Sequence, residues 1–210
     1  MKDGHAIVAD LTKEADMKRA IEEAITKMGG LDILVNSGGA MNDEMEGQSE
    51  DAILAAIKLH VTGNLTLIRA AEEELVKNKG AVVNVSSVAA IIPFPSMNPY
   101  CVAKAAQDTL TRNLALEFAT KGVRINSVLP GAIRTEVFEQ MAEKNGITAQ
   151  QVADELAVRH GMQRVAEPEE VAAPVVFLAS DAASFITGVN LPVDGAATLG
   201  FWFNATKFPG

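Results

Sequence analysis

Short continuous runs of apolar residues alternate along the chain with longer segments in which apolar residues recur every three or four positions. Runs of this kind are typical of strands buried on both faces, whereas the recurrent spacing is typical of amphipathic helices. Because the two kinds of segment alternate throughout, the sequence predicts an α/β fold with a parallel sheet. The predicted strands cover residues 6–9, 31–35, 81–85, 123–129 and 189–193.

Capping residues mark the starts of the predicted helices. Thr12 and Ser49 are placed to cap two of them, because a hydroxyl accepts a hydrogen bond from the first turn. Asn98 followed by Pro99 marks the start of a third. No repeat or linker interrupts the pattern, so residues 1–210 are predicted to form one domain. The predicted helices cover residues 13–28, 49–78, 98–121, 133–165 in two pieces, and 168–180.

The composition is that of an ordinary globular protein. The chain has 210 residues, of which 48% are apolar, and a formal net charge of −9. An acidic protein repels nucleic acids and anionic membranes, so we expect neither as a partner. No apolar run approaches the ~20 residues of a bilayer-spanning helix, and no signal peptide is recognised. Cys101 is the only cysteine, which excludes an intrachain disulfide and fits an expected cytoplasmic location.

Three side chains with complementary chemistry lie around the predicted strand 81–85 and helix 98–121. Tyr100 and Lys104 are four positions apart, so both project from one face of the helix. A nearby ammonium stabilises phenolate, so we expect Lys104 to lower the pKa of Tyr100 and make it a general acid/base. Ser87 follows the strand, thirteen positions before Tyr100, at the sheet edge where α/β folds bind ligands.

This spacing of Ser, Tyr and Lys resembles the catalytic pattern of the short-chain dehydrogenase/reductase family. Residues 32–39, DILVNSGG, resemble the NNAG segment of that family, and residues 129–135, LPGAIRT, match the motif after its sixth strand. Residues 193–196, VDGA, match the end of its last strand. The resemblance implies a three-layer, Rossmann-like parallel sheet and an NAD(P)-dependent oxidoreductase that acts on a carbonyl or alcohol substrate.

The resemblance also implies which residues hold the substrate and the cofactor, NAD or NADP. Tyr100 would exchange a proton with the substrate oxygen, Ser87 would hydrogen-bond that oxygen, and Lys104 would hold the nicotinamide ribose. Phe138 and Met141 would belong to a lid over the substrate. The implied cofactor-binding residues are Asp10, Leu11, Asn36, Ser37, Gly38, Tyr100, Lys104, Pro130, Gly131, Ile133 and Thr135.

The glycine-rich turn that holds the cofactor pyrophosphate in this family, TGxxxGxG, does not occur among the 16 glycines of the chain. The resemblance begins at the third strand of the family, so its first two strands are absent by comparison. It therefore implies a sheet truncated at the N-terminus. Losing charge-assisted hydrogen bonds worth roughly 1.5–3 kcal/mol each predicts weakened binding of the dinucleotide.

A histidine occupies the position of the fourth catalytic residue. The family places an Asn twenty-seven residues before the catalytic Ser, and the residue twenty-seven before Ser87 is His60. The resemblance implies that His60 holds a water in a proton relay to Lys104, because imidazole titrates near neutral pH. The alternative is that His60 only packs within its helix.

The missing strands would leave the strand at 31–35 with an exposed edge, which invites pairing. The strand at 6–9 could pair with this edge, a second copy of the chain could cover it, or the chain could fold poorly without a preceding segment. We favour the first two outcomes. The helices at 49–78 and 98–121 form the dimer face of the family, which implies a homodimer or homotetramer.

Two other functions stay open. The chain could be a truncated isoform or pseudoenzyme that binds nicotinamide cofactor weakly or not at all and acts as an oligomerising or regulatory partner. It could also be an isomerase or lyase in which Tyr100 transfers protons without a nicotinamide. His5, His60 and His160 are scattered along the sequence and form no ligand-spaced cluster, so no metal site is expected.

Overall fold

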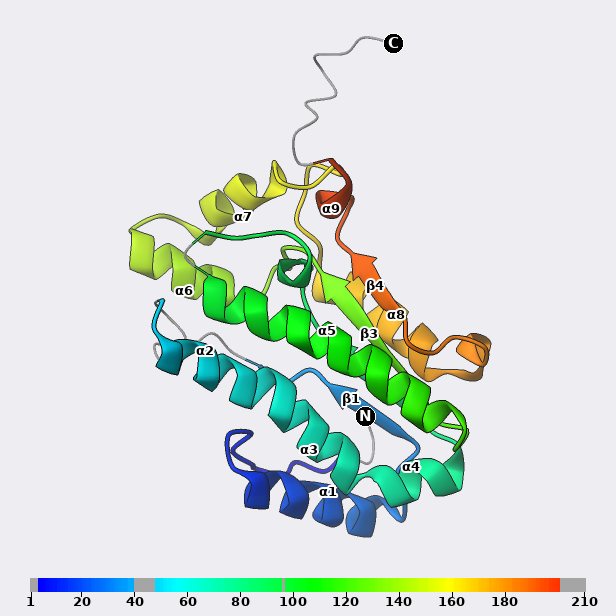
Figure 1. Cartoon of the computed structure of the whole chain (residues 1–210). Coiled ribbons are helices and arrows are strands. Elements are labelled where there is room, and N and C mark those ends of the chain that lie inside the picture. The colour runs from blue at the N-terminus through cyan, green and yellow to red at the C-terminus, as the bar shows by residue number, and fades with distance from the viewer. Residues whose placement is uncertain (1–3, 40–47, 96, 201–210) are drawn as a thin grey trace.

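The computed structural model describes residues 4–39, 48–95 and 97–200 (Figure 1). Within these residues, four parallel strands form one sheet in the order β1-β2-β3-β4. The expected α/β class with a parallel sheet is therefore confirmed. The strands are β1 (Ile33–Asn36), β2 (Ala81–Val85), β3 (Arg124–Pro130) and β4 (Asn190–Val193).

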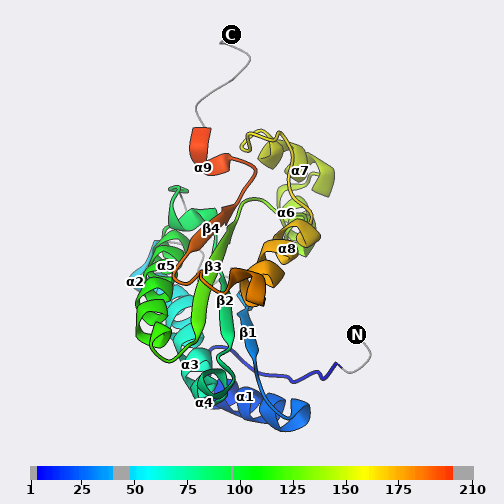
Figure 2. The same cartoon turned by 90° about the vertical axis from the view of Figure 1, so that its right-hand side faces the viewer.

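Helices lie on both sides of the sheet and give the fold three layers (Figure 2). The helices on one side are α1 (Glu14–Met28), α2 (Glu50–Ile57), α3 (Gly63–Ala70), α4 (Glu72–Asn78) and α5 (Asn98–Ala119). Those on the other side are α6 (Glu136–Asn145), α7 (Ala149–Ala157) and α8 (Pro168–Ala179). The short helix α9 (Ala197–Gly200) follows β4, and two 3-10 turns are η3 (Val88–Ala90) and η4 (Asp181–Ala183).

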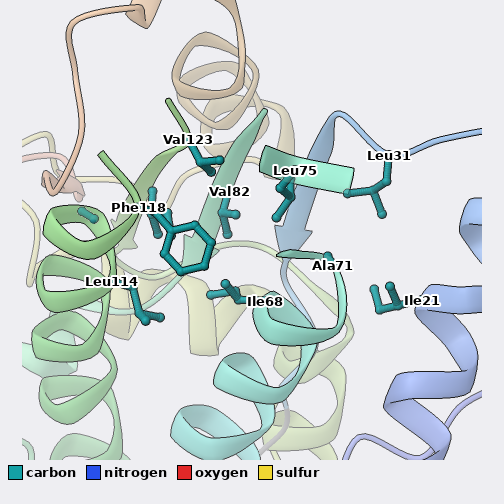
Figure 3. Close-up of a cluster of buried hydrophobic side chains, with 11 residues drawn as sticks. Ile21, Leu31, Ile68, Ala71, Leu75, Val82, Leu114, Phe118 and Val123 are labelled. Carbon is teal, nitrogen blue, oxygen red and sulfur yellow. The ribbon is translucent and has the colours of Figure 1, made fainter. Parts of the chain in front are cut away.

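An extensive apolar core lies between the sheet and helices α1, α3 and α5 (Figure 3). Phe118 of α5 and Ile68 of α3 are fully buried and pack in one cluster with Val82 of β2. Ile21 brings α1 to the same cluster. Removing this apolar surface from water is the main source of stability for such a layer.

A second core lies on the opposite face of the sheet. Leu178 of α8 and Ala183 of η4 pack there with Val83 of β2 and Val128 of β3. Val82 and Val83, which are adjacent in β2, thus enter different cores, because successive side chains of a strand point to opposite faces. This explains why Ala81, Val82 and Val83 are apolar in succession rather than alternating with polar residues.

Four of the predicted strands are confirmed, and one is wrong. The strand at 81–85 agrees at both ends, and the other three sheet strands agree to within two residues. Residues 6–9 form no regular structure, and Val8 is 89% exposed. Among the described residues β1 pairs only with β2, so the expectation that residues 6–9 pair with its free edge is wrong as well. Within the described part of the chain the run has no partner strand, and the Val8 carbonyl accepts a hydrogen bond from the Arg19 side chain of α1 at 2.7 Å instead.

One of the three predicted helix caps is confirmed. Ser49 caps α2, since its hydroxyl accepts a backbone N–H of the first turn at 3.1 Å. Thr12 does not cap α1: it donates its hydroxyl to Asp10, whose carboxylate also accepts the Thr12 N–H at 2.9 Å. Asn98 does not cap α5 either, because its side chain donates to Gln48.

The long predicted helix at 49–78 is present as four consecutive pieces. These are α2, a π-helical stretch η2 (Lys58–Thr62), α3 and α4. A π-helical stretch inside a helix frequently marks a functional site. By length and composition alone, one helical stretch of the described residues, Glu50–Ala70, is apolar enough to span a bilayer. Buried core helices meet the same criteria, and Ala56 and Ile68 of this stretch are fully buried.

The sheet ends at β1 with one apolar face bare. Ile33 and Val35 are 49% and 42% exposed, whereas Leu34 between them packs against the core. No described strand pairs with the outer edge of β1. The exposed edge predicted for residues 31–35 is therefore present in the single chain.

We expect Phe118→Ala to lower the free energy of unfolding by about 3–5 kcal/mol, because it leaves a cavity at a fully buried position. Asn113→Ala on the same helix is the matched control. Its side chain is exposed, so we expect a change within about 0.5 kcal/mol. Urea denaturation followed by circular dichroism measures both, and equal losses would contradict the assigned inner face of α5.

Candidate active site

A polar cluster forms where β2 ends and α5 begins. Ser87 follows β2 in extended backbone, and its hydroxyl accepts the Ala89 N–H at 3.1 Å as η3 begins. Tyr100 lies in the first turn of α5, next to the buried Pro99, and the Ser87 side chain is close enough to favour the ionised form of its phenol. Two residues thirteen positions apart in sequence are thus brought together at the carboxyl end of the sheet, where α/β folds bind ligands.

Lys104 lies one turn further along α5. Its Nζ is 5.5 Å from the centre of the Tyr100 ring, and the residue is 4% exposed. The ammonium donates to the Val85 carbonyl and to Gln107 Oε1, both at 3.0 Å. Gln107 was not among the predicted site residues, although its position three after Lys104 places it on the same face of the helix.

Burial controls the proton affinities of both residues. Loss of hydration raises the pKa of Tyr100, and the Ser87 side chain only partly opposes this effect. Burial also lowers the pKa of Lys104 from 10.5 to about 8. The prediction that Lys104 lowers the pKa of Tyr100 is therefore wrong for the free protein. Desolvation dominates, because the ammonium makes its hydrogen bonds to Val85 and Gln107 rather than to the phenol.

His60 joins the cluster from the π-helical stretch. It is 2% exposed, and its ring meets Tyr100 edge to face, with ring centres 5.5 Å apart at 84°. The ring also lies against the backbone of Gly39, where an added Cβ would be 2.7 Å from His60 Cε1. Gly39 is the last residue of the 32–39 segment that resembles the NNAG segment of the family, so the sequence already placed it beside the expected cofactor site.

Asn36 is held in a buried row of hydrogen-bonded side chains. Its Nδ2 donates to Asn84 Oδ1 at 2.9 Å across the β1–β2 pair. Asn84 Nδ2 donates in turn to Thr111 Oγ1 of α5 at 2.9 Å. The row ties both strands to α5, and the exposed residues Ser37 and Gly38 follow it directly.

Leu11 lies directly against Gly38, since a Cβ on that glycine would be 2.4 Å from Leu11 Cδ1. The structure thus brings together the two N-terminal segments predicted to bind the cofactor. The Asp10 carboxylate accepts hydrogen bonds from Thr12 and pairs with Lys13 at 3.1 Å. These contacts, the hydrogen bond from the Thr12 hydroxyl foremost, lower the pKa of Asp10 to about 2. Asp10 is therefore an ionised carboxylate whose partners are residues immediately before α1.

The remaining predicted cofactor residues lie at the end of β3 and in the loop that follows. Pro130 ends β3, and the Gly131 N–H donates to the Val193 carbonyl of β4 at 3.1 Å. Ile133 forms an isolated parallel bridge with the segment before α8. Thr135 is exposed at the N-terminus of α6. The sheet places this loop at its carboxyl edge, as predicted.

The predicted lid has its own small core. Phe138 of α6 is 4% exposed and packs with Val152 and Ala153 of α7. It therefore fixes α6 to α7 and does not present its ring to a cleft. Met141 on the same helix is 38% exposed. A lid role for these helices stays a prediction.

A buried carboxyl follows the cluster on α5. Asp108 accepts a hydrogen bond from the Ser127 hydroxyl of β3 at 3.3 Å, and burial raises the pKa of Asp108. Across the part of the chain that the structure describes, no group of three or more His, Cys, Asp or Glu side chains is arranged to hold a metal ion.

Comparison with known proteins identifies the class to which this fold and site belong. A family model described as enoyl-(acyl carrier protein) reductase matches residues 1–198. The 3beta-hydroxysteroid dehydrogenase 1 of Eggerthella lenta is 36% identical over 203 residues, which cover 94% of this chain and 76% of that protein. The chain belongs to the short-chain dehydrogenase/reductase family, and it is an oxidoreductase of the type that this family comprises.

Solved structures share the fold over most of their length. The ligand-free aldohexose dehydrogenase AldT of Thermoplasma acidophilum has a TM-score of 0.88 at 30% identity, with 99% of this chain and 84% of that chain covered. The structure titled ElxO with NADP bound has a TM-score of 0.79 at 31% identity, with 90% and 75% covered. The Rossmann-like fold expected from the sequence is thereby confirmed.

Tyr100 is the only tyrosine in the chain, so the ultraviolet absorbance of phenolate reports this residue alone. We expect its titration midpoint to lie above 10, because burial raises its pKa from 10.0. Ser87→Ala removes a side chain that lowers this pKa, so its midpoint should be higher still. The control, Ser184→Ala at an exposed serine, should match the wild type. A wild-type midpoint below 10, with circular dichroism unchanged, would show that the ammonium outweighs burial.

The buried ammonium of Lys104 makes stability depend on pH. Its pKa is about 8 in the folded protein against an ordinary 10.5, so between these values the unfolded chain binds more protons and stability rises with pH. At about 1.4 kcal/mol per tenfold change in proton affinity, this rise is on the order of 3 kcal/mol.

We expect Lys104→Met to remove this rise between about pH 8 and about pH 10, because methionine has no proton to lose. Lys77→Met is the matched control, since the Lys77 side chain is 63% exposed. Urea denaturation of all three proteins across this range provides the comparison. If wild type and Lys104→Met gain stability equally with pH, the folded protein does not hold Lys104 as a desolvated ammonium.

Proposed function

We propose that this protein transfers hydride between NAD(P) and a small alcohol or carbonyl substrate, with Ser87, Tyr100 and Lys104 as its catalytic residues. The observation that carries the proposal is the cluster itself. The Ser87 side chain acts on the Tyr100 phenol, and the Lys104 ammonium is anchored 5.5 Å from the centre of the phenol ring. Similarity to proteins named as dehydrogenases of hydroxysteroids and aldohexoses supports the substrate class.

In this proposal Tyr100 passes the proton and Ser87 orients the substrate oxygen. Because burial raises the pKa of Tyr100, its phenol is protonated at neutral pH. That form donates a proton to a carbonyl oxygen during reduction. Oxidation of an alcohol needs the phenolate as base, so it should be favoured at higher pH. Ser87 hydrogen-bonds the same oxygen and holds it near the phenol.

The residues beside the cluster fit the nicotinamide half of NAD(P), which supplies the hydride when bound. Lys104 and Tyr100 would hold the nicotinamide ribose. Gly39 has no Cβ where one would collide with His60, so its backbone lies directly against the buried ring beside Tyr100. The loop after β3 would line the opposite side of the cofactor.

We infer that binding is weakened at the pyrophosphate and adenosine half. The sequence carries no glycine-rich turn, and Leu11 occupies the space beside Gly38. The Asp10 carboxylate is already engaged by Thr12 and Lys13. Each lost charge-assisted hydrogen bond is worth roughly 1.5–3 kcal/mol, or about one to two orders of magnitude in affinity.

We propose His60 as a relay residue that supports proton transfer at Tyr100. The two rings are in edge-to-face contact, and His60 is buried within a π-helical stretch of a kind common at functional sites. An imidazole can accept and donate a proton near neutral pH, which a relay requires. The alternative role, packing alone, predicts that His60→Asn has no effect on the pH dependence of turnover.

We further propose that residues 1–210 act as one domain in a cytoplasmic homo-oligomer. The outer faces of α2 and α5, which pack side by side, carry exposed apolar residues that support an interface between copies. Those residues are Leu54, Val102 and Leu116.

Titration with reduced nicotinamide mononucleotide and with NADH or NADPH tests the cofactor assignment. We expect the mononucleotide to bind within about tenfold of the better dinucleotide, because the adenosine half gains few of the charge-assisted hydrogen bonds. Nicotinamide fluorescence measures both affinities. Lys104→Met should weaken both ligands together, since it removes the group proposed to hold the ribose. A dinucleotide preference above about a hundredfold would mean that another part of the chain replaces the missing turn.

Tyr100→Phe is the matched variant for chemistry. It should weaken nucleotide binding by about tenfold at most, the loss of one hydrogen bond to the ribose, and reduce carbonyl reduction by about 10²–10⁴-fold, because the proton donor is lost. Absence of any nicotinamide binding would overturn the oxidoreductase proposal and favour a regulatory partner or proton transfer without nicotinamide.

A further inference from the structure

His160 lies in the turn after α7, and its ring joins two separate backbone segments. Nε2 accepts the Ala132 N–H, in the loop after β3, at 3.0 Å. Nδ1 is 2.9 Å from the Leu156 carbonyl in α7. The residue is 5% exposed, so these contacts form in a setting where few water molecules compete with them.

The two contacts define the protonation state of the ring. A backbone N–H can only donate, so Nε2 must be an unprotonated acceptor. A carbonyl oxygen can only accept, so Nδ1 must carry the hydrogen. His160 therefore satisfies both contacts only as the neutral Nδ1–H tautomer. A second proton would place an Nε2–H against the Ala132 N–H, and that hydrogen bond would be lost.

The packing around the ring makes the contact specific. An added Cβ on Gly131 would be 2.6 Å from His160 Nε2, so only a glycine lets the loop come this close. The Met162 N–H, two residues after His160, donates to the Gly195 carbonyl at 3.0 Å. The turn at His160 thus joins the loop after β3, the end of α7 and the end of β4.

The charged groups around this turn already have partners. Arg164 forms two hydrogen bonds of 2.6 Å with Glu170 of α8. Asp194, after β4, accepts the Ala196 and Thr198 N–H groups at 3.1 and 2.8 Å. Together with His160 they line a cavity of about 330 Å³.

We propose that His160 is a positioning residue: in its neutral form it holds the loop after β3, and protonation of the ring releases that loop. The loop carries Ile133 and Thr135 and leads into α6. Its link to the cofactor rests on the proposed function. The cofactor side of the site is then assembled while the ring is neutral and loosened once the ring gains a second proton.

The tautomer can be measured on the wild-type protein without any ligand. The chain has three histidines, so nitrogen-15 NMR of the imidazoles gives a simple spectrum. At about pH 8 we expect one ring with a protonated Nδ1 and a bare Nε2, and this signal should vanish in His160→Gln. A protonated Nε2 on His160 at this pH would overturn the proposal.

Amide hydrogen exchange tests the release. We expect protection of the Ala132 N–H, relative to the amides within β3, to fall by about tenfold between about pH 8 and about pH 5, the loss of one hydrogen bond. His160→Gln keeps an acceptor that does not titrate, so its protection should not change with pH. His160→Leu has no acceptor and should show low protection throughout. His5→Gln, at an exposed histidine, should behave as the wild type.

Protection that stays constant in the wild type while His160 gains a proton would overturn the proposal, and so would a ring that stays neutral down to about pH 5. If His160→Leu does not fold, the NMR and amide exchange measurements on the wild type still test the proposal. In the enzyme assay we expect the KM of the wild type for NADH to rise in acid, because the loop is released. This rise should be absent in His160→Gln. Correct tautomer and exchange results without any reductase activity would refute the proposed function and leave the role of His160 intact.

Discussion

The arrangement of the site depends on one buried ammonium group. Lys104 is almost fully buried, and a buried charge is strongly unfavourable unless its hydrogen bonds are satisfied. The Val85 carbonyl and the Gln107 amide satisfy two of its donors. Because Val85 ends β2, the same bond fixes α5 over the end of the strand. The proximity of Tyr100 and Ser87 follows from that placement.

Helix α5 provides hydrogen bonds near the site because its buried face is polar there, and that face becomes apolar further along the helix. Its buried polar residues, three or four positions apart near the site, are Lys104, Gln107, Asp108 and Thr111. Its buried apolar residues further along are Leu114, Ala115 and Phe118. Side chains of the polar half form hydrogen bonds with Asn84 of β2 and Ser127 of β3. The two strands therefore also carry buried polar side chains. The apolar half provides the hydrophobic burial that offsets the cost of the polar half.

The difference between local and long-range interactions explains which features could be predicted from the sequence. Strand 81–85 was predicted at both ends because its residues are apolar on both faces, which is a local property. Residues 6–9 have a similar composition but no partner strand, and partners are decided by the whole fold. The cluster of Ser87, Tyr100 and Lys104 was predictable because a strand end and a helical spacing fix it. The direction of the Tyr100 pKa shift was not predictable. It depends on how far the side chain is buried, which the spacing of residues in the sequence does not reveal.

The bare edge of β1 lies next to the residues proposed to bind the cofactor. Ile33 and Val35 are exposed on this four-residue strand, and Asn36 at its end begins the row of hydrogen bonds to α5. Gly38 and Gly39 follow at once. A second copy or a neighbouring segment that covers this edge stabilises β1, and thereby the backbone that would approach the nicotinamide. Coupling of this kind is reciprocal, so a ligand that orders the glycine turn also favours the covered edge. Cofactor affinity and assembly are therefore expected to change together in this protein.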